Sequence, residues 1–204
     1  MKKIMMIAAM MVATLSANAQ NEVGQFSIKP TAGINIASMT KTEDSKTRVG
    51  LVVGLDTEYG VAKNFSVTAG LLYSMQGVKF TDQLLGAKVN TTWKFDYINI
   101  PILAQYYIVP GLAIKAGLQP GFKVSSKVSA EASADGATVK DSEKLDNTNG
   151  FALAIPFGLS YEYKNFVLDA RYNLGLTKAF GSEWNTDSKH SVFAITLGYK
   201  IPLN

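Results

Sequence analysis

Few residues in this chain have the chemistry of a catalyst. His190 is its one histidine and is followed by Ser191, so the pair resembles a base beside a nucleophile. In an extended strand, however, adjacent side chains point to opposite faces, and the two cannot form a dyad by themselves. The acidic pairs Glu43-Asp44 and Asp56/Glu58 fit a solvated loop and charges inside a fold better than a metal site. The sequence predicts no enzyme, no metal and no cofactor.

Composition narrows the class of protein. The chain has 204 residues, 47% of them hydrophobic and 18% charged, which fits one folded domain and excludes a disordered chain. The absence of cysteine excludes a disulfide scaffold, a thiol enzyme and a lipid-anchored lipoprotein. The net charge of +4 is small and scattered, so nucleic acid is not an expected partner.

The first residues have the pattern of an export signal. Lys2-Lys3 form a basic start, Ile4 to Leu15 is apolar, and Ala17-Asn18-Ala19 has the small-x-small form that signal peptidase cuts. The apolar run is shorter than the roughly 20 residues of a membrane-spanning helix. We therefore expect residues 1–19 to be removed as a signal peptide, leaving a domain over 20–204 that begins at Gln20.

The remainder alternates between apolar and polar residues, which is typical of strands with one apolar face. Phe151, Leu153, Ile155 and Phe157, for example, alternate with alanine, proline and glycine. No helix is expected after the signal. The pattern predicts eight strands, at about 25–38, 48–60, 65–79, 93–107, 112–126, 150–163, 166–179 and 190–203.

The connections between these strands differ in length in a regular way. Those at 61–64, 108–111 and 164–165 are short, whereas those at 39–47, 80–92, 127–149 and 181–189 are long and polar. Short turns at one end and long loops at the other, around an even number of strands, indicate an eight-stranded antiparallel up-and-down transmembrane β-barrel. We expect both termini on the periplasmic side of an outer membrane, and the loop 127–149 to be the most mobile segment.

A soluble eight-stranded barrel also alternates, but its polar face lies outside. Here the polar face is mostly small, as at Gly50, Gly54, Gly70 and Ser74, which suits the narrow interior of a barrel. Aromatic residues gather at both strand ends, where they predict two girdles at the membrane interfaces. The expected outer girdle is Phe80, Trp93, Phe95, Phe122, Phe180 and Phe193.

Charged residues recur on the polar face and are therefore expected inside the barrel. Buried charges must pair, so they predict an ion-pair network that plugs the lumen. A charged pore constriction is the alternative, but eight strands leave an interior just wide enough for side chains. The residues are Lys29, Asp56, Glu58, Lys115, Lys123, Glu162, Asp169, Arg171 and Lys200.

Three segments resemble a known family. Leu71–Gly77, Tyr97–Leu103 and Asp169–Leu176 are similar to strands of the small outer-membrane β-barrel family described as porin family or PorT-like. The resemblance implies a barrel and supplies no catalytic residues. In addition, Thr196–Leu203 resembles the C-terminal signal that is read by the barrel assembly machinery, although it ends without the usual aromatic residue.

These observations lead to an expected function. We expect a non-enzymatic outer-membrane protein with an envelope-structural or surface-interaction role through its external loops. The expected partners are outer-membrane lipid and, during biogenesis, the assembly machinery; the sequence identifies no other. An accessory role in protein secretion is the alternative that the PorT-like resemblance implies. A lipid- or peptide-modifying enzyme at the barrel rim is disfavoured by the argument on His190.

Overall fold

Eleven β-strands make up the protein in its computed structural model, which describes residues 22–40, 45–84, 87–134, 137–144, 149–179 and 188–203. No helix in this described part is long and apolar enough to cross a membrane. The strands are β1 (Phe26–Met39), β2 (Ser45–Ala62), β3 (Phe65–Leu84), β4 (Ala87–Asn99), β5 (Ile102–Val109), β6 (Leu112–Ala134), β7 (Ala137–Lys144), β8 (Phe151–Tyr163), β9 (Phe166–Lys178), β10 (Lys189–Tyr199) and β11 (Ile201–Leu203).

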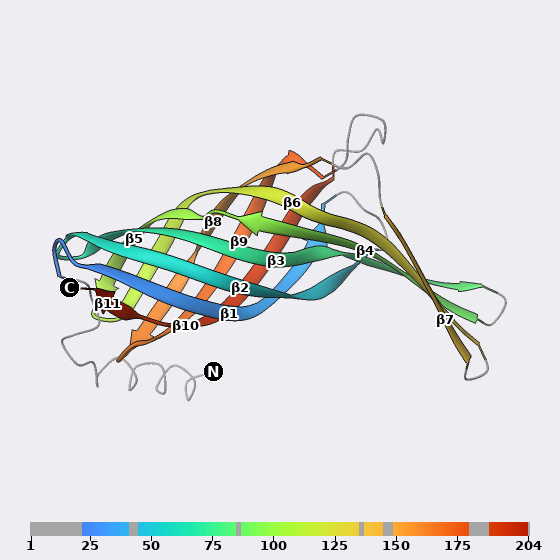
Figure 1. Ribbon diagram of the computed structural model, residues 1–204, viewed down its shortest axis with the longest axis horizontal. Coiled ribbons are helices and arrows are strands. Elements are labelled where there is room, and N and C mark those ends of the chain that lie inside the picture. Colours follow the sequence, from blue (N-terminus) through green and yellow to red (C-terminus); the bar gives the residue numbers. More distant parts are fainter. Residues whose placement is uncertain are drawn as a thin grey trace, which may run out of the picture.

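The strands form one closed antiparallel ring (Figure 1). β4 and β5 are consecutive parts of one wall strand, as are β10 and β11, and β7 lies outside the ring as a partner of β6 alone. β1 pairs with β10 and β11 and so joins the end of the sheet to its beginning. The ring therefore has eight strands in up-and-down order, which confirms the predicted fold class.

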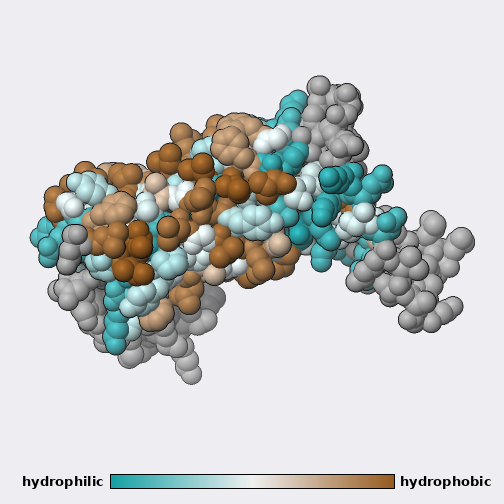
Figure 2. All heavy atoms as spheres, in the orientation of Figure 1, coloured by the Kyte–Doolittle hydropathy of each residue, from teal (hydrophilic) through white to brown (hydrophobic). Residues whose placement is uncertain are grey.

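The two faces of the wall have opposite character. Along β9, Asp169 and Arg171 are buried, whereas Leu168 and Leu174 are exposed on the outer face. The outer face of the barrel is largely apolar, and hydrophilic residues gather toward one end (Figure 2). Polar side chains inside and apolar side chains outside suit a bilayer, because lipid tails are as apolar as the exposed leucines. Ile155 faces outward and Ser160 inward, as the alternation predicts.

Short turns lie at one end of the barrel, together with the C-terminal strand β11 (Figure 1). The β8–β9 turn is Lys164-Asn165, and its Lys164 has a left-handed backbone, with φ of 54°. Next to this turn an aromatic row crosses three strands, because Phe166 pairs with both Tyr163 and Tyr199. All three rings are exposed, so this end carries an aromatic girdle as expected.

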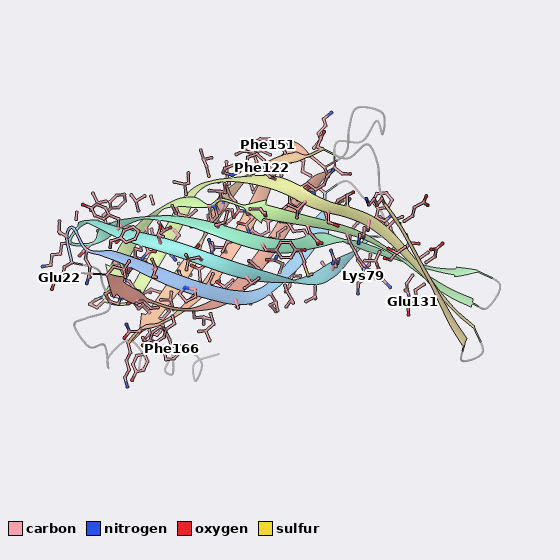
Figure 3. The ribbon with its side chains drawn as sticks, viewed as in Figure 1. Glu22, Lys79, Phe122, Glu131, Phe151 and Phe166 are labelled. Carbon is pink, nitrogen blue, oxygen red and sulfur yellow. The ribbon has the colours of Figure 1, made fainter. Side chains whose placement is uncertain are left out.

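The outer girdle is only partly as expected. Phe122 and Phe151 lie on the outer surface with their rings 5.7 Å apart (Figure 3). Phe95, in contrast, is fully buried inside, and Phe80 and Trp93 pack against the same interior cluster. The prediction of these three residues as lipid-facing is therefore wrong; Phe180 lies outside the described residues.

Two expected long loops are strands over most of their length. β3 and β4 stay paired out to Leu84 and Ala87, and β6 and β7 out to Ala134 and Ala137. The far ends of β3, β4 and β6 together with the whole of β7 form a four-stranded sheet that extends beyond the barrel (Figure 1). We call it the projecting sheet. The prediction of loops over 80–92 and 127–149 is wrong for these paired residues.

A proline interrupts the wall between β4 and β5. Ile100 and Pro101 fall outside both strands, yet the alternation continues across them, because Asn99, Pro101 and Leu103 all face the interior. The neighbouring strands bridge the gap, because the Ile100 N–H donates to the Pro120 carbonyl and the Gly70 N–H to the Pro101 carbonyl. The predicted strand 93–107 is therefore divided in two without opening the barrel.

Candidate functional site: the charged lumen

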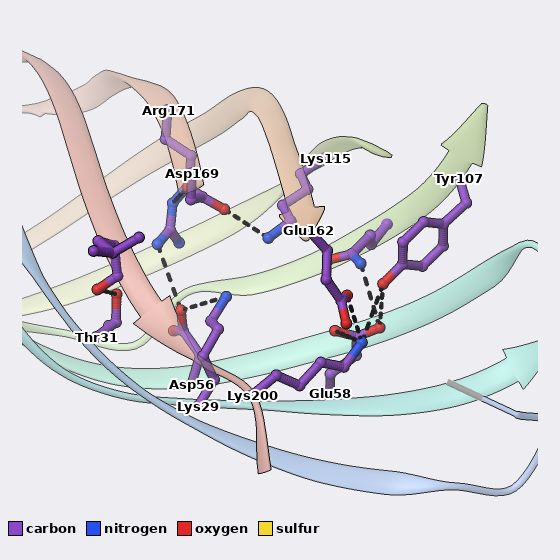
Figure 4. Close-up of polar contacts among 12 residues, drawn as sticks. Lys29, Thr31, Asp56, Glu58, Tyr107, Lys115, Glu162, Asp169, Arg171 and Lys200 are labelled. Carbon is purple, nitrogen blue, oxygen red and sulfur yellow. Dashed lines mark hydrogen bonds and ion pairs between the residues drawn. The ribbon is translucent and has the colours of Figure 1, made fainter. Parts of the chain in front are cut away.

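All but Lys123 of the charged residues that the sequence places on the polar face come together in the half of the lumen nearest the short turns. They project inward from β1, β2, β6, β8 and β9 and from the junction of β10 and β11, and none is more than 7% exposed. We call them the lumen network (Figure 4). Its members are Lys29, Asp56, Glu58, Lys115, Glu162, Asp169, Arg171 and Lys200.

Five residues form a chain of ion pairs across the barrel. Arg171 is at its centre, with Nε 2.6 Å from Asp169 Oδ1 and Nη2 3.6 Å from Asp56 Oδ2. Lys115 donates to Asp169 Oδ2 at 2.6 Å, and Lys29 Nζ lies 3.4 Å from Asp56 Oδ2. Because a buried charge without a partner costs several kcal/mol, this alternation of sign is what makes their burial tolerable.

A second cluster lies around Lys200. Its Nζ is 2.8 Å from Glu162 Oε2 and 3.3 Å from Glu58 Oε2. Tyr107 donates its hydroxyl proton to Glu58 Oε1 at 2.7 Å, and Gln105 Nε2 donates to the same oxygen at 3.3 Å. Glu58 thus meets a cation and two neutral donors.

Charge balances only over the network as a whole. The five-residue chain has three cations and two carboxylates, and the Lys200 cluster has one cation and two carboxylates. The first therefore carries a formal charge of +1 and the second −1, which sum to zero. Each carboxylate already has a cation, which leaves these acids poorly suited to hold a metal ion.

A glycine makes room for this packing. A Cβ at Gly70 of β3 would lie 2.2 Å from Asp56 Oδ1, closer than any real contact. The small residues that the sequence shows on the polar face thus provide the space that long charged side chains fill.

Some of the network could not be read from charge alone. Tyr107 and Gln105 face inward on β5, on either side of exposed Tyr106. The alternation predicts that they point into the barrel, but not that Glu58 is their partner.

Lys123, expected inside, is only half buried and lies eight residues along β6 from Lys115. Glu43, Asp44 and the cleavage residues Ala17, Ala19 and Gln20 lie outside the described residues.

An apolar and aromatic cluster lies near the outer end of the lumen. Met39, Val78, Phe95, Tyr97 and Ala179 form a buried cluster there. This apolar cluster was not predicted. Beyond the lipid-facing part of the wall, water lies outside the barrel, so apolar side chains pack in the interior instead.

His190 is buried beside this cluster. Its Nε2 lies 3.1 Å from the Tyr97 hydroxyl. Ser191 faces the other way and shares a hydrogen bond of 2.6 Å with the Tyr172 hydroxyl. The two side chains do not meet, as the strand geometry requires.

Solved structures share this architecture at low sequence identity. Ail of Yersinia pestis, in complex with the heparin analogue sucrose octasulfate, is 18% identical with a TM-score of 0.50 over 88% of this chain and 100% of that one. Neisserial surface protein A is 14% identical with a TM-score of 0.44, covering 86% of this chain and 96% of its own. OprG of Pseudomonas aeruginosa is 15% identical with a TM-score of 0.38, covering 90% and 98%.

The sequence has no significant match among curated proteins. A family model described as "Outer membrane protein beta-barrel domain" matches residues 18–181, which is most of the chain. The chain therefore belongs to the outer membrane protein beta-barrel domain family, which implies a location in an outer membrane.

Proposed function

We propose that this protein is a non-enzymatic surface-interaction protein of the outer membrane, and that its contact surface is the projecting sheet. The observation that carries the proposal is the length of β6, which has 23 residues. A tilted strand needs about 9–11 residues to cross the bilayer. More than half of β6 therefore remains for a structure outside the membrane.

The projecting sheet has features of a protein-contact surface. Among the described residues, the pairing of β3 with β2 ends at Phe80, and β7 pairs with β6 alone. Open strand edges present backbone N–H and C=O groups that an extended partner segment can pair with. Charges of both signs lie along it, including Lys127, Glu131, Glu143 and Lys144.

This mixture of charges bears on the kind of partner. Ail was solved with a heparin analogue, which is a polyanion. In this chain Lys94, Lys127 and Lys144 lie side by side on one face of the sheet, and Glu131, four residues along β6 from Lys127, shares that face, so it is not purely basic. A protein segment fits such a surface better than a polyanion does.

We further propose that the lumen network is a plug. Eight charged side chains fill the half of the interior nearest the short turns, and the apolar cluster packs near the outer end. The network then has a structural role, and the external sheet carries the interaction.

Removal of one hairpin tests the contact surface. Lys127 and Lys144 are paired, so a two-residue Asn-Gly turn can join them in place of residues 128–143. Tagged wild type and the shortened variant are cross-linked on intact cells, and the recovered proteins are compared. We expect recovery of external partners to fall at least tenfold in the shortened variant.

The matched control changes the opposite end of the barrel. Replacing the Pro110-Gly111 turn with Asn-Gly leaves the projecting sheet intact and should leave recovery unchanged. Equal recovery with and without the hairpin would contradict the proposal. Recovery of periplasmic secretion components, lost on changing the turn, would favour the accessory role in secretion that the PorT-like resemblance implies.

A further inference from the structure

A small cavity of mixed lining lies in the lumen beside His190 and is used by neither the lumen network nor the projecting sheet. Its volume is about 20 Å³. Four side-chain amides, a hydroxyl and an imidazole contribute to its lining. These residues are Gln76, Asn99, Gln119, Asn173, Thr177 and His190.

Two buried atoms in this lining are left without a protein partner. Neither Asn173 Oδ1 nor His190 Nδ1 has a hydrogen bond within the described residues, although both side chains are 92% buried. The other polar atom of each side chain is hydrogen-bonded. Asn173 Nδ2 donates to the Val192 carbonyl, and His190 Nε2 shares a hydrogen bond with the Tyr97 hydroxyl. An unpaired polar atom in such a place costs about 1–3 kcal/mol.

The wall next to the cavity explains why there is space. The β9–β10 ladder shifts register between the Leu174–Ser191 and Lys178–Lys189 pairs, which leaves extra residues on β9. The β8–β9 ladder ends at the Ala154–Gly175 pair, and the Leu153 N–H donates instead to Thr177 Oγ1. A β-bulge therefore moves this stretch of β9 relative to both neighbours.

We infer that this cavity is a binding site for an ordered water molecule that bridges His190 Nδ1 and Asn173 Oδ1. A cavity holds water when it offers at least 10–15 Å³ and two or more polar partners, and both conditions are met here. Water both donates and accepts, so it satisfies Asn173 Oδ1 and either tautomer of His190. A transition metal would find one imidazole and neutral amides, with no carboxylate or thiolate in the lining.

The experiment counts slowly exchanging water in refolded protein in micelles by magnetic relaxation dispersion, together with a crystal structure. Asn173→Leu removes the acceptor and fills the cavity, so it should lose one long-lived water. Asn35→Leu is the matched control: Asn35 is an equally buried amide, but its Nδ2 is bonded to Ser74 Oγ at 2.8 Å. The control should keep the water.

A second variant covers the case in which Asn173→Leu does not fold. Val192 also lines the cavity, and Val192→Ile adds a methyl group to its wall while every polar group is kept. It should lose the same water. An unchanged count in whichever of these two variants folds would overturn the inference, as would a crystal structure with an ammonium or metal ion in the cavity.

Discussion

Lys115 of β6 and Asp169 of β9 meet across an intervening strand, with Nζ 2.6 Å from Oδ2. Between them, on β8, Gly158 lies opposite both Lys115 and Arg171. A Cβ at Gly158 would come within 2.1 Å of the Ala170 carbonyl oxygen. A bare backbone at this point of β8 thus lies where Lys115 of β6 meets Asp169 and Arg171 of β9.

The convergence predicts strong coupling between Arg171 and Asp169. Arg171→Ala leaves Asp56 and Asp169 short of a cation, and breaking such a buried pair costs about 3–5 kcal/mol. Asp169→Ala should cost a similar amount, because Lys115 and Arg171 then lose their carboxylate. In a double-mutant cycle measured by urea unfolding in lipid vesicles, the double variant should lose clearly less free energy of unfolding than the two single variants together. Additive losses would show that the two charges do not interact.

A pair of adjacent tyrosines tests the Lys200 cluster. Tyr107→Phe removes the shorter of the two hydrogen bonds to Glu58 Oε1 and leaves the 3.3 Å bond from Gln105. Loss of a hydrogen bond to a charged group should lower the free energy of unfolding by about 1.5–3 kcal/mol. Tyr106→Phe is the control, since that ring is 49% exposed on the outer face and its loss should stay within about 0.5 kcal/mol. Similar effects at both positions would contradict the role given to Tyr107.

The outward direction of Ile155 predicts sensitivity to charge. Ile155→Arg places a guanidinium against lipid and should cost about 2–4 kcal/mol in a bilayer, with less protein assembled in the membrane. Ile155→Leu should behave like wild type in the same vesicle-folding assay. If the arginine variant were as stable as wild type, that face would not be in contact with the hydrocarbon core.

Topology is testable because the chain has no cysteine. Ser142→Cys lies on exposed β7 and should react with a membrane-impermeant maleimide on intact cells. Asn64→Cys, in the exposed β2–β3 turn, should react only after the outer membrane is permeabilised. The reverse pattern would invert the orientation of the barrel.

Export makes a further prediction about the N-terminus. Mass spectrometry of protein purified from the outer membrane should give Gln20, free or cyclised, as the first residue. Ala19→Phe should block cleavage, because signal peptidase needs a small residue there. An intact Met1 on the assembled wild-type barrel would refute the signal peptide.

Alternation in the sequence predicted the ring and the direction of most side chains, because lipid and lumen differ sharply in polarity. The short turn at 164–165 fixes the register of its two strands, so Ser160 pairs with Asp169 and Gly158 with Arg171. Alternation could not predict the partners of Arg171, because it gives the direction in which a side chain points and not its distance from other side chains.

The prediction of an outer aromatic girdle failed where the surroundings change. Near the outer rim water replaces lipid outside the wall. Phe95 therefore packs inside, on the same face as Tyr97, while Asp96 on the other face accepts a hydrogen bond from Tyr73. Beyond the rim, residues 125–134 are mostly small or polar on both faces, and their backbone pairing with β4 and β7 leaves no apolar pattern to detect.

The closing seam has a consequence for the order of biogenesis. Lys200 follows both of its carboxylate partners in the chain, and β10 and β11, which pair with β1, follow the other strands of the ring. Before β10 and β11 are synthesised, the chain has two unpaired strand edges, and Glu58 and Glu162 lack their cation. Unpaired edges invite aggregation, so a nascent chain of this protein needs protection until these two strands close the ring.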